Sequence, residues 1–263
     1  MSFETILFEI KDGIARLTLN RPDRLNSFNE TLHTEVRAAF EQLRADPTAR
    51  VLVLTGAGRG FCAGQDLSDR AMAGDDAPPD LGATVERNWK PLILALQGLP
   101  VPTICAVNGI AAGAGVSVAL ACDLVIAAES ASFLQAFSKI GLIPDSGGTW
   151  QLPKRVGLAR ALGLAMLAEK VPARQAADWG LIWSCVPDAE LAASVDKIAT
   201  QFANAPTKAL VRTREAMRAA HINDLETQLN LERDMMAELG RSNDYREGVA
   251  AFMEKRTPKF TGK

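Results

Sequence analysis

Three glycine-rich segments contain the residues of this chain that are most able to do chemistry. The first, Gly56–Leu67, follows a short apolar run that is typical of a buried strand. It lacks the Gly-Lys-Ser/Thr ending of a nucleotide-binding loop and the spacing of a dinucleotide fingerprint. Its glycines permit close backbone approach and positive φ, so its main-chain amides could face a ligand. An ordinary flexible turn explains the spacing equally well.

The second segment, Asn108–Ser117, places a turn of small residues between the end of a strand and the start of a helix. Helix N-termini carry unpaired amides and a partial positive charge. Small residues allow an oxyanion to approach those amides closely. Tight packing of a helix against a strand also selects glycine and alanine, and this segment alone favours packing over anion binding.

The third segment, Gly141–Trp150, carries Asp145 just before an expected helix. One hypothesis makes Asp145 the N-cap of that helix, because aspartate is among the best N-cap residues. The other makes it a proton carrier, because desolvation by Leu142, Ile143 and Trp150 would raise the pKa of its carboxyl group. The segment alone favours the N-cap.

Alternating strands and helices must position these segments. Apolar runs predict strands at residues 3–10, 14–19, 51–55, 103–107 and 124–127. Ser27 and Glu30 have the spacing of a capping box at the start of a helix, and a later helix should bend near Pro91. We therefore expect an α/β body over residues 1–200 and a helical region over 201–263.

Composition excludes several classes of function. The chain has 263 residues with a net charge of −2, which favours neither nucleic acid nor an anionic membrane as a partner. No apolar run reaches membrane-spanning length. The 4 cysteines form no C-x-x-C pair, and with 2 histidines, His33 and His221, a metal site is not expected. Neither histidine lies in a glycine-rich segment, so we expect structural or solvated roles. We expect a cytoplasmic protein. Residues 68–80, which are rich in Asp, Gly and Pro, should form a mobile loop.

The three segments, in this order and spacing, resemble the crotonase (enoyl-CoA hydratase/isomerase) superfamily. The resemblance covers essentially the whole chain, from Asn20-Arg21-Pro22 to Lys259–Lys263. A closer resemblance is to the members of this superfamily that isomerise the ring epoxide of phenylacetyl-CoA in bacterial phenylacetate degradation. It is carried by residues 24–29, 58–67, 136–139, 141–150 and 244–248.

The resemblance implies a crotonase (ClpP-like) spiral of β-β-α units with a helical C-terminal trimerisation region, assembled as a homotrimer or a dimer of trimers. It implies an acyl-CoA thioester as substrate and no cofactor besides that coenzyme A. The amides of Gln65 and Ala114 would bind the thioester oxygen. The residues that it places around the substrate and CoA are Arg24, Leu25, Ala63, Gln65, Asp66, Leu67, Gly113, Phe137, Phe260 and Lys263.

The resemblance also concerns the acid/base groups. The hydratases carry two glutamates where this chain has Ser117 and Phe137, which argues against simple hydration. Asp145 matches the single aspartate of several isomerases. The implied reactions are a 3-enoyl-CoA to 2-enoyl-CoA shift and conversion of ring-1,2-epoxyphenylacetyl-CoA to oxepin-CoA. Another enoyl-CoA isomerase, or a hydratase of fatty or aromatic acid degradation, is the alternative. Phe137 would line an apolar pocket or pack in the core.

Overall fold

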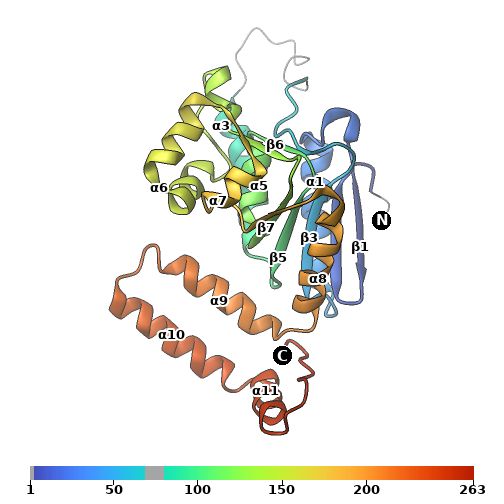
Figure 1. Cartoon of the computed structure of the whole chain (residues 1–263), viewed down its shortest axis with the longest axis vertical. Helices are drawn as coiled ribbons and strands as arrows, with labels where there is room; N and C mark the ends of the chain where they lie inside the picture. The colour runs from blue at the N-terminus through green and yellow to red at the C-terminus, as the bar shows by residue number, and fades with distance from the viewer. Residues whose placement is uncertain (1–2, 69–79) are drawn as a thin grey trace.

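Two β-sheets form the centre of the computed structural model, which describes residues 3–68 and 80–263 (Figure 1). Most of the predicted mobile loop, residues 69–79, lies outside these ranges. The larger sheet has the order β1 (Ile6–Lys11), β2 (Ile14–Leu19), β3 (Val51–Gly56), β5 (Thr103–Val107), β7 (Leu124–Ala128), β10 (Ser184–Val186). The smaller sheet has the order β4 (Gly60–Cys62), β6 (Ile110–Ala112), β8 (Ser132–Leu134), β9 (Lys170–Pro172).

The two sheets are built from consecutive strand pairs. In the pairs β3–β4, β5–β6 and β7–β8, the first strand joins the larger sheet and the second joins the smaller. Strands β2, β3, β5, β7 and β10 run parallel, and β1 is antiparallel to β2. This is the predicted α/β spiral of β-β-α units. The three-residue strands were missed because they are too short to show a period-2 pattern.

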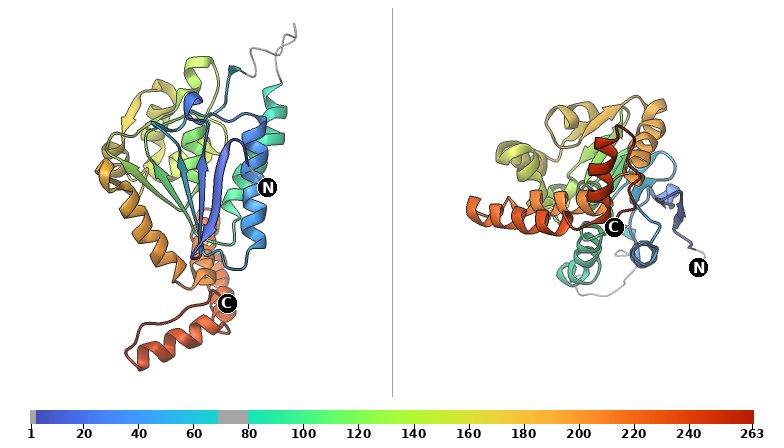
Figure 2. Two further views of the ribbon diagram at one scale, coloured as in Figure 1. Left: turned by 90° about the vertical axis from the view of Figure 1, so that its right-hand side faces the viewer. Right: turned by 90° about the horizontal axis from the view of Figure 1, so that it is seen from below.

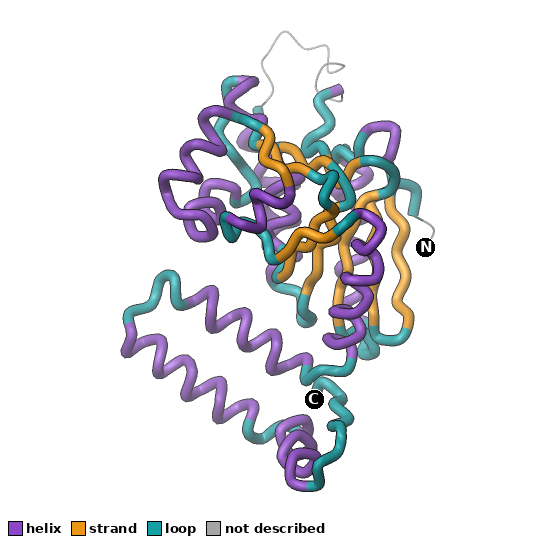
Figure 3. The backbone as a smooth tube through the Cα atoms, in the orientation of Figure 1, coloured by secondary structure: helices purple, strands orange, loops and turns teal. Residues whose placement is uncertain are grey.

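Helices cover the sheets (Figure 3). Helix α8 (Leu191–Ala203) packs against β2, β3, β5 and β7, while α1 (Glu30–Ala45) packs against β1 and β2. Helix α5 (Ala114–Ala121) contacts strands of both sheets, and every one of its residues is buried. Helices α6 (Gly148–Leu167) and α7 (Ala173–Asp178) also belong to the body. The capping box was wrong: the N-cap of α1 is Asn29, whose side chain accepts from the Leu32 amide.

The segment around Pro91 contains a π-helical turn. Helix α3 (Leu81–Thr84) leads into the turn Val85–Trp89, which leads into α4 (Lys90–Gln97). Proline has no N–H to bond the carbonyl four residues earlier. That carbonyl, on Arg87, accepts instead from the Arg37 guanidinium at 3.1 Å. The structure thus has a π turn directly before Pro91, and the bend expected there stays a prediction.

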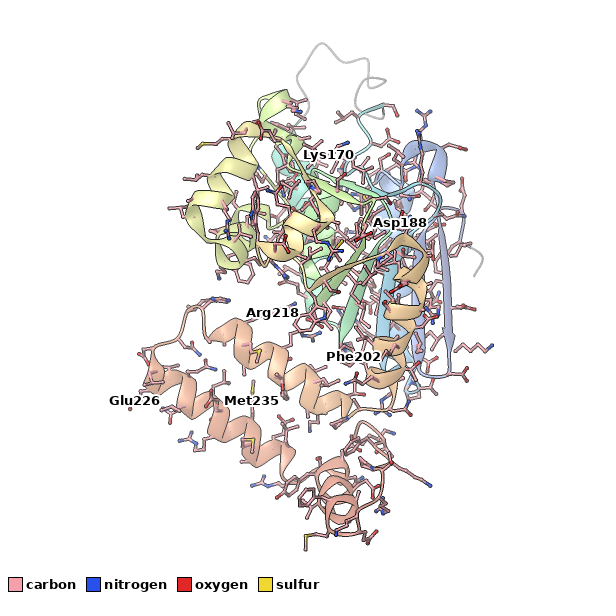
Figure 4. All side chains as sticks on the ribbon, in the orientation of Figure 1. Lys170, Asp188, Phe202, Arg218, Glu226 and Met235 are labelled. Atoms are coloured by element: carbon pink, nitrogen blue, oxygen red, sulfur yellow. The ribbon has the colours of Figure 1, made fainter. Side chains whose placement is uncertain are left out.

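The C-terminal helices α9 (Thr207–Ala219), α10 (Leu225–Leu239) and α11 (Asn243–Met253) project from one end of the larger sheet (Figures 1 and 2). Arg218 reaches from α9 toward the body (Figure 4), and both it and Arg214 pair with Asp123. No helix within residues 3–68 and 80–263 is long and apolar enough to cross a membrane. The division at residue 200 stays a prediction.

Candidate active site

A cavity of about 340 Å³ lies beside the N-terminus of α5. It is largely apolar, and Lys139 and Asp145 contribute the only charged side chains among its described lining residues. All three glycine-rich segments reach it. Its lining comprises Ala63, Gln65, Leu67, Leu81, Gly82, Val85, Gly113, Ala114, Ala136, Phe137, Lys139, Ile140, Leu142, Ile143 and Asp145.

The main-chain amide of Gln65 is oriented by pairing with Phe28. The Gly64 carbonyl accepts from the Phe28 amide at 2.7 Å, and the Asp66 amide donates to the Phe28 carbonyl at 2.9 Å. In a trans peptide, the carbonyl of one residue and the N–H of the next point in opposite directions. The Gln65 N–H therefore points away from Phe28, and no group in the described part of the chain accepts a hydrogen bond from it.

The amide of Ala114 lies close to this loop. Ala114 is the first residue of α5, so its N–H has no acceptor within the helix. Gly64 has a φ of +86°, and a Cβ on it would lie 3.0 Å from the Ala114 nitrogen and 2.9 Å from the Ala112 oxygen. Only glycine permits this approach. The first two segments thus bring a loop amide and a helix N-terminal amide together at one cavity.

Asp145 lines the same cavity, and its neighbours fix its main chain. Its carbonyl accepts from the Ser117 hydroxyl at 3.0 Å and from the Gly148 amide at 2.8 Å. Its carboxylate oxygen Oδ1 accepts from the Ser146 hydroxyl at 2.9 Å. The N-cap hypothesis for Asp145 was wrong, because the N-cap of α6 is Gly147. Its carboxylate is therefore placed at the cavity rather than at the helix terminus.

Ser117 and Phe137, which the resemblance aligns with the two hydratase glutamates, both lie at or beside the cavity. Ser117 is fully buried, and its hydroxyl is engaged with Asp145. Phe137 lines the cavity with 8% of its surface exposed, so it packs in the core and faces the cavity at once. Among the described lining residues, Asp145 is the only carboxylate. A single acid/base group next to two free amides can stabilise an enolate and move one proton.

Arg24 and Leu25 lie next to the cavity loop but outside the described lining. Leu25 has a φ of 48°, and its carbonyl accepts from the Ala63 amide at 2.9 Å. Arg24 is exposed at the end of the 3₁₀ turn Pro22–Arg24. Leu25 thus supports the loop that carries the Gln65 amide, and the CoA contacts of both residues stay predictions.

Asp66 is buried and does not belong to the described lining of the cavity. It forms an ion pair with Arg21 at 3.0 Å and accepts hydrogen bonds from Ser68. Burial alone would raise the pKa of Asp66, but the hydrogen bonds from Ser68 and the Arg21 charge outweigh it and lower the pKa. Asp66 is therefore a charged anchor of the loop, and its direct contact with CoA stays a prediction.

Phe260 and Lys263 do not reach this cavity within one chain. They line a separate cavity of about 570 Å³ among the C-terminal helices, at the opposite end of the molecule from α3 and β6 (Figures 1 and 2). The C-terminal tail is held in place by Asp244, whose carboxylate accepts from the amides of Thr261 and Gly262, each at 2.7 Å.

Several residues at the site were not singled out from the sequence. Asn26 is fully buried, and its side-chain amide donates to the carbonyls of Ala57, Gly60 and Phe61. It fixes the first glycine-rich segment, although it lies 31 to 35 positions earlier in the sequence. Leu81, Gly82, Val85 and Lys139 also line the cavity, and no local pattern connects them to the three segments.

The family model described as enoyl-CoA hydratase/isomerase matches residues 9–263. The chain belongs to the enoyl-CoA hydratase/isomerase family. The predicted membership of the crotonase superfamily is thereby confirmed. The 1,2-epoxyphenylacetyl-CoA isomerase of Escherichia coli K12 is 54% identical over 260 residues, which cover 99% of each chain. A protein of Rhodobacter capsulatus described as a probable enoyl-CoA hydratase is 48% identical over 263 residues, which cover 100% of each chain.

The crotonase fold is shared with solved members of the enoyl-CoA hydratase/isomerase family. The crystal structure of an enoyl-CoA hydratase from Bacillus anthracis superposes with a TM-score of 0.92 at 33% identity, covering 99% of this chain and 100% of that one. Relatives named for each of the two reaction types thus match this chain over nearly its whole length. Because one fold supports several chemistries, the choice between an isomerase and a hydratase has to be argued from the residues at the cavity.

Proposed function

We propose that this chain is an acyl-CoA isomerase that converts ring-1,2-epoxyphenylacetyl-CoA to oxepin-CoA and also shifts 3-enoyl-CoA to 2-enoyl-CoA. One observation carries the proposal: Asp145 is the only carboxylate among the described cavity residues. The family resemblance adds that Ser117 and Phe137 would stand where the hydratases carry their two glutamates. The 54% identity to the isomerase of Escherichia coli supports the same choice.

The double-bond shift follows from the groups at the cavity. The thioester oxygen would accept from the amides of Gln65 and Ala114, which stabilise the negative charge that develops when C2 loses a proton. Asp145 would remove that proton and return one at C4, acting first as base and then as acid. The steps proposed for Asp145 and the two amides call on no cofactor besides the coenzyme A that the substrate carries.

The conversion of the ring epoxide to the oxepin is an isomerisation, with no net gain or loss of atoms. The carbon–carbon bond shared by the two rings breaks, and the oxygen becomes part of a seven-membered ring. The Phe137 side chain and the apolar residues Leu142 and Val85 offer a surface suited to the substrate ring. Exchange of the C2 proton with D₂O during this reaction distinguishes proton transfer by Asp145 from stabilisation of charge by its carboxylate.

A homotrimer or dimer of trimers would complete the CoA site. Many apolar side chains on α9, α10 and α11 are exposed, among them Met217, Leu225, Leu229, Met236, Val249 and Phe252. Exposed apolar patches of this kind favour association. Because Phe260 and Lys263 lie at the opposite end of the molecule from the cavity, their contact with CoA would come from a neighbouring copy. The buried free cysteines are in keeping with the cytoplasm.

The test is turnover of 3-hexenoyl-CoA and of ring-1,2-epoxyphenylacetyl-CoA by the purified protein, with the products separated. Formation of 2-hexenoyl-CoA and oxepin-CoA is expected. Accumulation of 3-hydroxyhexanoyl-CoA from 2-hexenoyl-CoA as the main activity would instead support the hydratase alternative, which the relative from Rhodobacter capsulatus favours.

A further inference from the structure

The side chain of Gln65 is held at both of its polar atoms. Its Nε2 donates to the Phe28 carbonyl at 3.0 Å, and its Oε1 accepts from the Trp89 indole Nε1 at 3.0 Å. The peptide groups on either side of Gln65 are already bonded to Phe28. The residue that supplies the cavity amide is therefore fixed by its side chain as well as by its main chain.

Trp89 has little freedom to turn its N–H elsewhere. It is fully buried, and its ring centroid lies 5.1 Å from that of Phe28 and 4.5 Å from that of His33. The His33 ring meets it at 84°, edge to face. Close packing of this kind restricts side-chain rotation, so the indole N–H keeps one direction, toward Gln65.

The π-helical turn sets the register of Trp89. The turn runs from Val85, which lines the cavity, to Trp89, which holds Gln65. One residue more or fewer in a helix rotates the following side chains by roughly 100°. The irregularity before Pro91 therefore lets one short segment contribute both to the cavity wall and to the support behind the Gln65 loop.

We propose that Trp89 is a positioning residue of the oxyanion hole, which orients the Gln65 amide through the hydrogen bond to the Gln65 side chain. The inference rests on the proposed function, since it takes the Gln65 amide as a donor to the thioester oxygen. An oxyanion donor is effective only when it is fixed in advance at the correct position. Loss of the indole donor should therefore slow the reaction without preventing substrate binding.

Kinetics of four variants test this role. Trp89→Phe keeps an aromatic ring and removes the donor, and Gln65→Met keeps the length of the side chain and removes both polar atoms. Each should lower kcat about tenfold with KM within about twofold, and the double variant should be no slower than Gln65→Met because the two share one interaction. Trp183→Phe, at a side chain 67% exposed, is the control and should keep kcat. A loss confined to the free energy of unfolding overturns the proposal.

A spectroscopic readout separates this proposal from the proposed function. Hexanoyl-CoA, labelled with ¹³C at its carbonyl, cannot isomerise, and its bound C=O stretch reports polarisation by the amides. The wild type should lower that frequency, and Trp89→Phe should lose part of the lowering, whether or not either proposed substrate is turned over. Equal shifts in the two proteins would overturn the role of Trp89 alone. An unshifted frequency in the wild type would overturn the proposed oxyanion hole, and the role of Trp89 with it.

Discussion

The hydroxyl of Ser117 donates a hydrogen bond to the main-chain carbonyl oxygen of Asp145 at 3.0 Å. Ser117 lies on α5, whose first amide belongs to Ala114. The bond therefore joins the helix that supplies one proposed oxyanion donor to the segment that supplies the proposed acid/base. A short hydroxyl on one segment thus supports the main chain of the aspartate on another.

Replacement of Ser117 by alanine should weaken this link. The Asp145 carbonyl keeps its bond from the Gly148 amide, so we expect a loss of about 1 kcal/mol in the free energy of unfolding. We expect kcat on 3-hexenoyl-CoA to fall about fivefold, because the carboxylate is less well placed. Ser130→Ala, in an exposed turn, is the matched control. An unchanged kcat in Ser117→Ala would show that the link has no part in catalysis.

Substitution of Gly64 by alanine should disrupt the oxyanion hole. The new Cβ would lie within 3.0 Å of the Ala112 oxygen and the Ala114 nitrogen, at a φ of +86°. The two amides must separate, and we expect kcat to fall by about a hundredfold or more. Gly163→Ala, in α6 with no atom within 4 Å of the new Cβ, should leave kcat unchanged. Equal activity of the two variants would contradict the assignment.

The free energy of unfolding should decrease as the pH is lowered, because His33 is buried in its neutral form. Burial, together with the Arg37 charge, lowers the pKa of His33 from 6.5 to about 4, while Glu30 and Gln65 oppose the shift. The unfolded state therefore binds the proton first, so His33 stabilises the fold above pH 6.5, and this stability is lost between pH 6.5 and 4. From pH 7.5 to 5 the loss amounts to about 2 kcal/mol.

Urea unfolding at both pH values measures this contribution. His33→Leu should remove about 2 kcal/mol of the difference between the free energies of unfolding at pH 7.5 and at pH 5. His221→Gln, at the other histidine, should retain the wild-type difference. If His33→Leu retains the whole difference, the buried neutral imidazole is not its source.

The Asp244 carboxylate should matter for CoA binding if the tail contacts a neighbouring copy's substrate. Asp244→Ala removes the acceptor for the amides of Thr261 and Gly262 and frees the tail that carries Phe260 and Lys263. KM for acyl-CoA should rise about fivefold or more, with kcat nearly unchanged. Asp234→Ala, at an exposed carboxylate, is the control. An unchanged KM would argue against any role of the tail in CoA binding.

Several strands followed from the sequence where the signal is local, whereas the spiral and the roles of the site residues were implied by the family resemblance. The strand at 103–107 was predicted with its observed bounds, and glycine or small residues marked the places where Gln65 and Ala114 meet. The two departures at Ser117 and Phe137 could be read only against the family, because burial and small size give no chemistry by themselves.

Tertiary contacts between distant residues could not be predicted. Trp89 and Gln65 are joined by one hydrogen bond across 24 positions, and the N-terminal Asn26 reaches three carbonyls of a later loop. The periodicity of apolar residues along the sequence does not indicate such pairs. The N-cap hypothesis for Asp145 failed for a similar reason: Gly147, at a φ of 81°, begins the helix two residues later and leaves the carboxylate at the cavity.

Conversion of 3-hexenoyl-CoA by the wild type and by Asp145→Asn tests the central claim most directly. Asparagine keeps the size of the side chain and removes its ability to take a proton. The wild type should form 2-hexenoyl-CoA, and Asp145→Asn should retain the fold and lose the turnover by about a thousandfold or more. Near-normal conversion by a folded Asp145→Asn protein would contradict the account, because the proton would then be carried by another group.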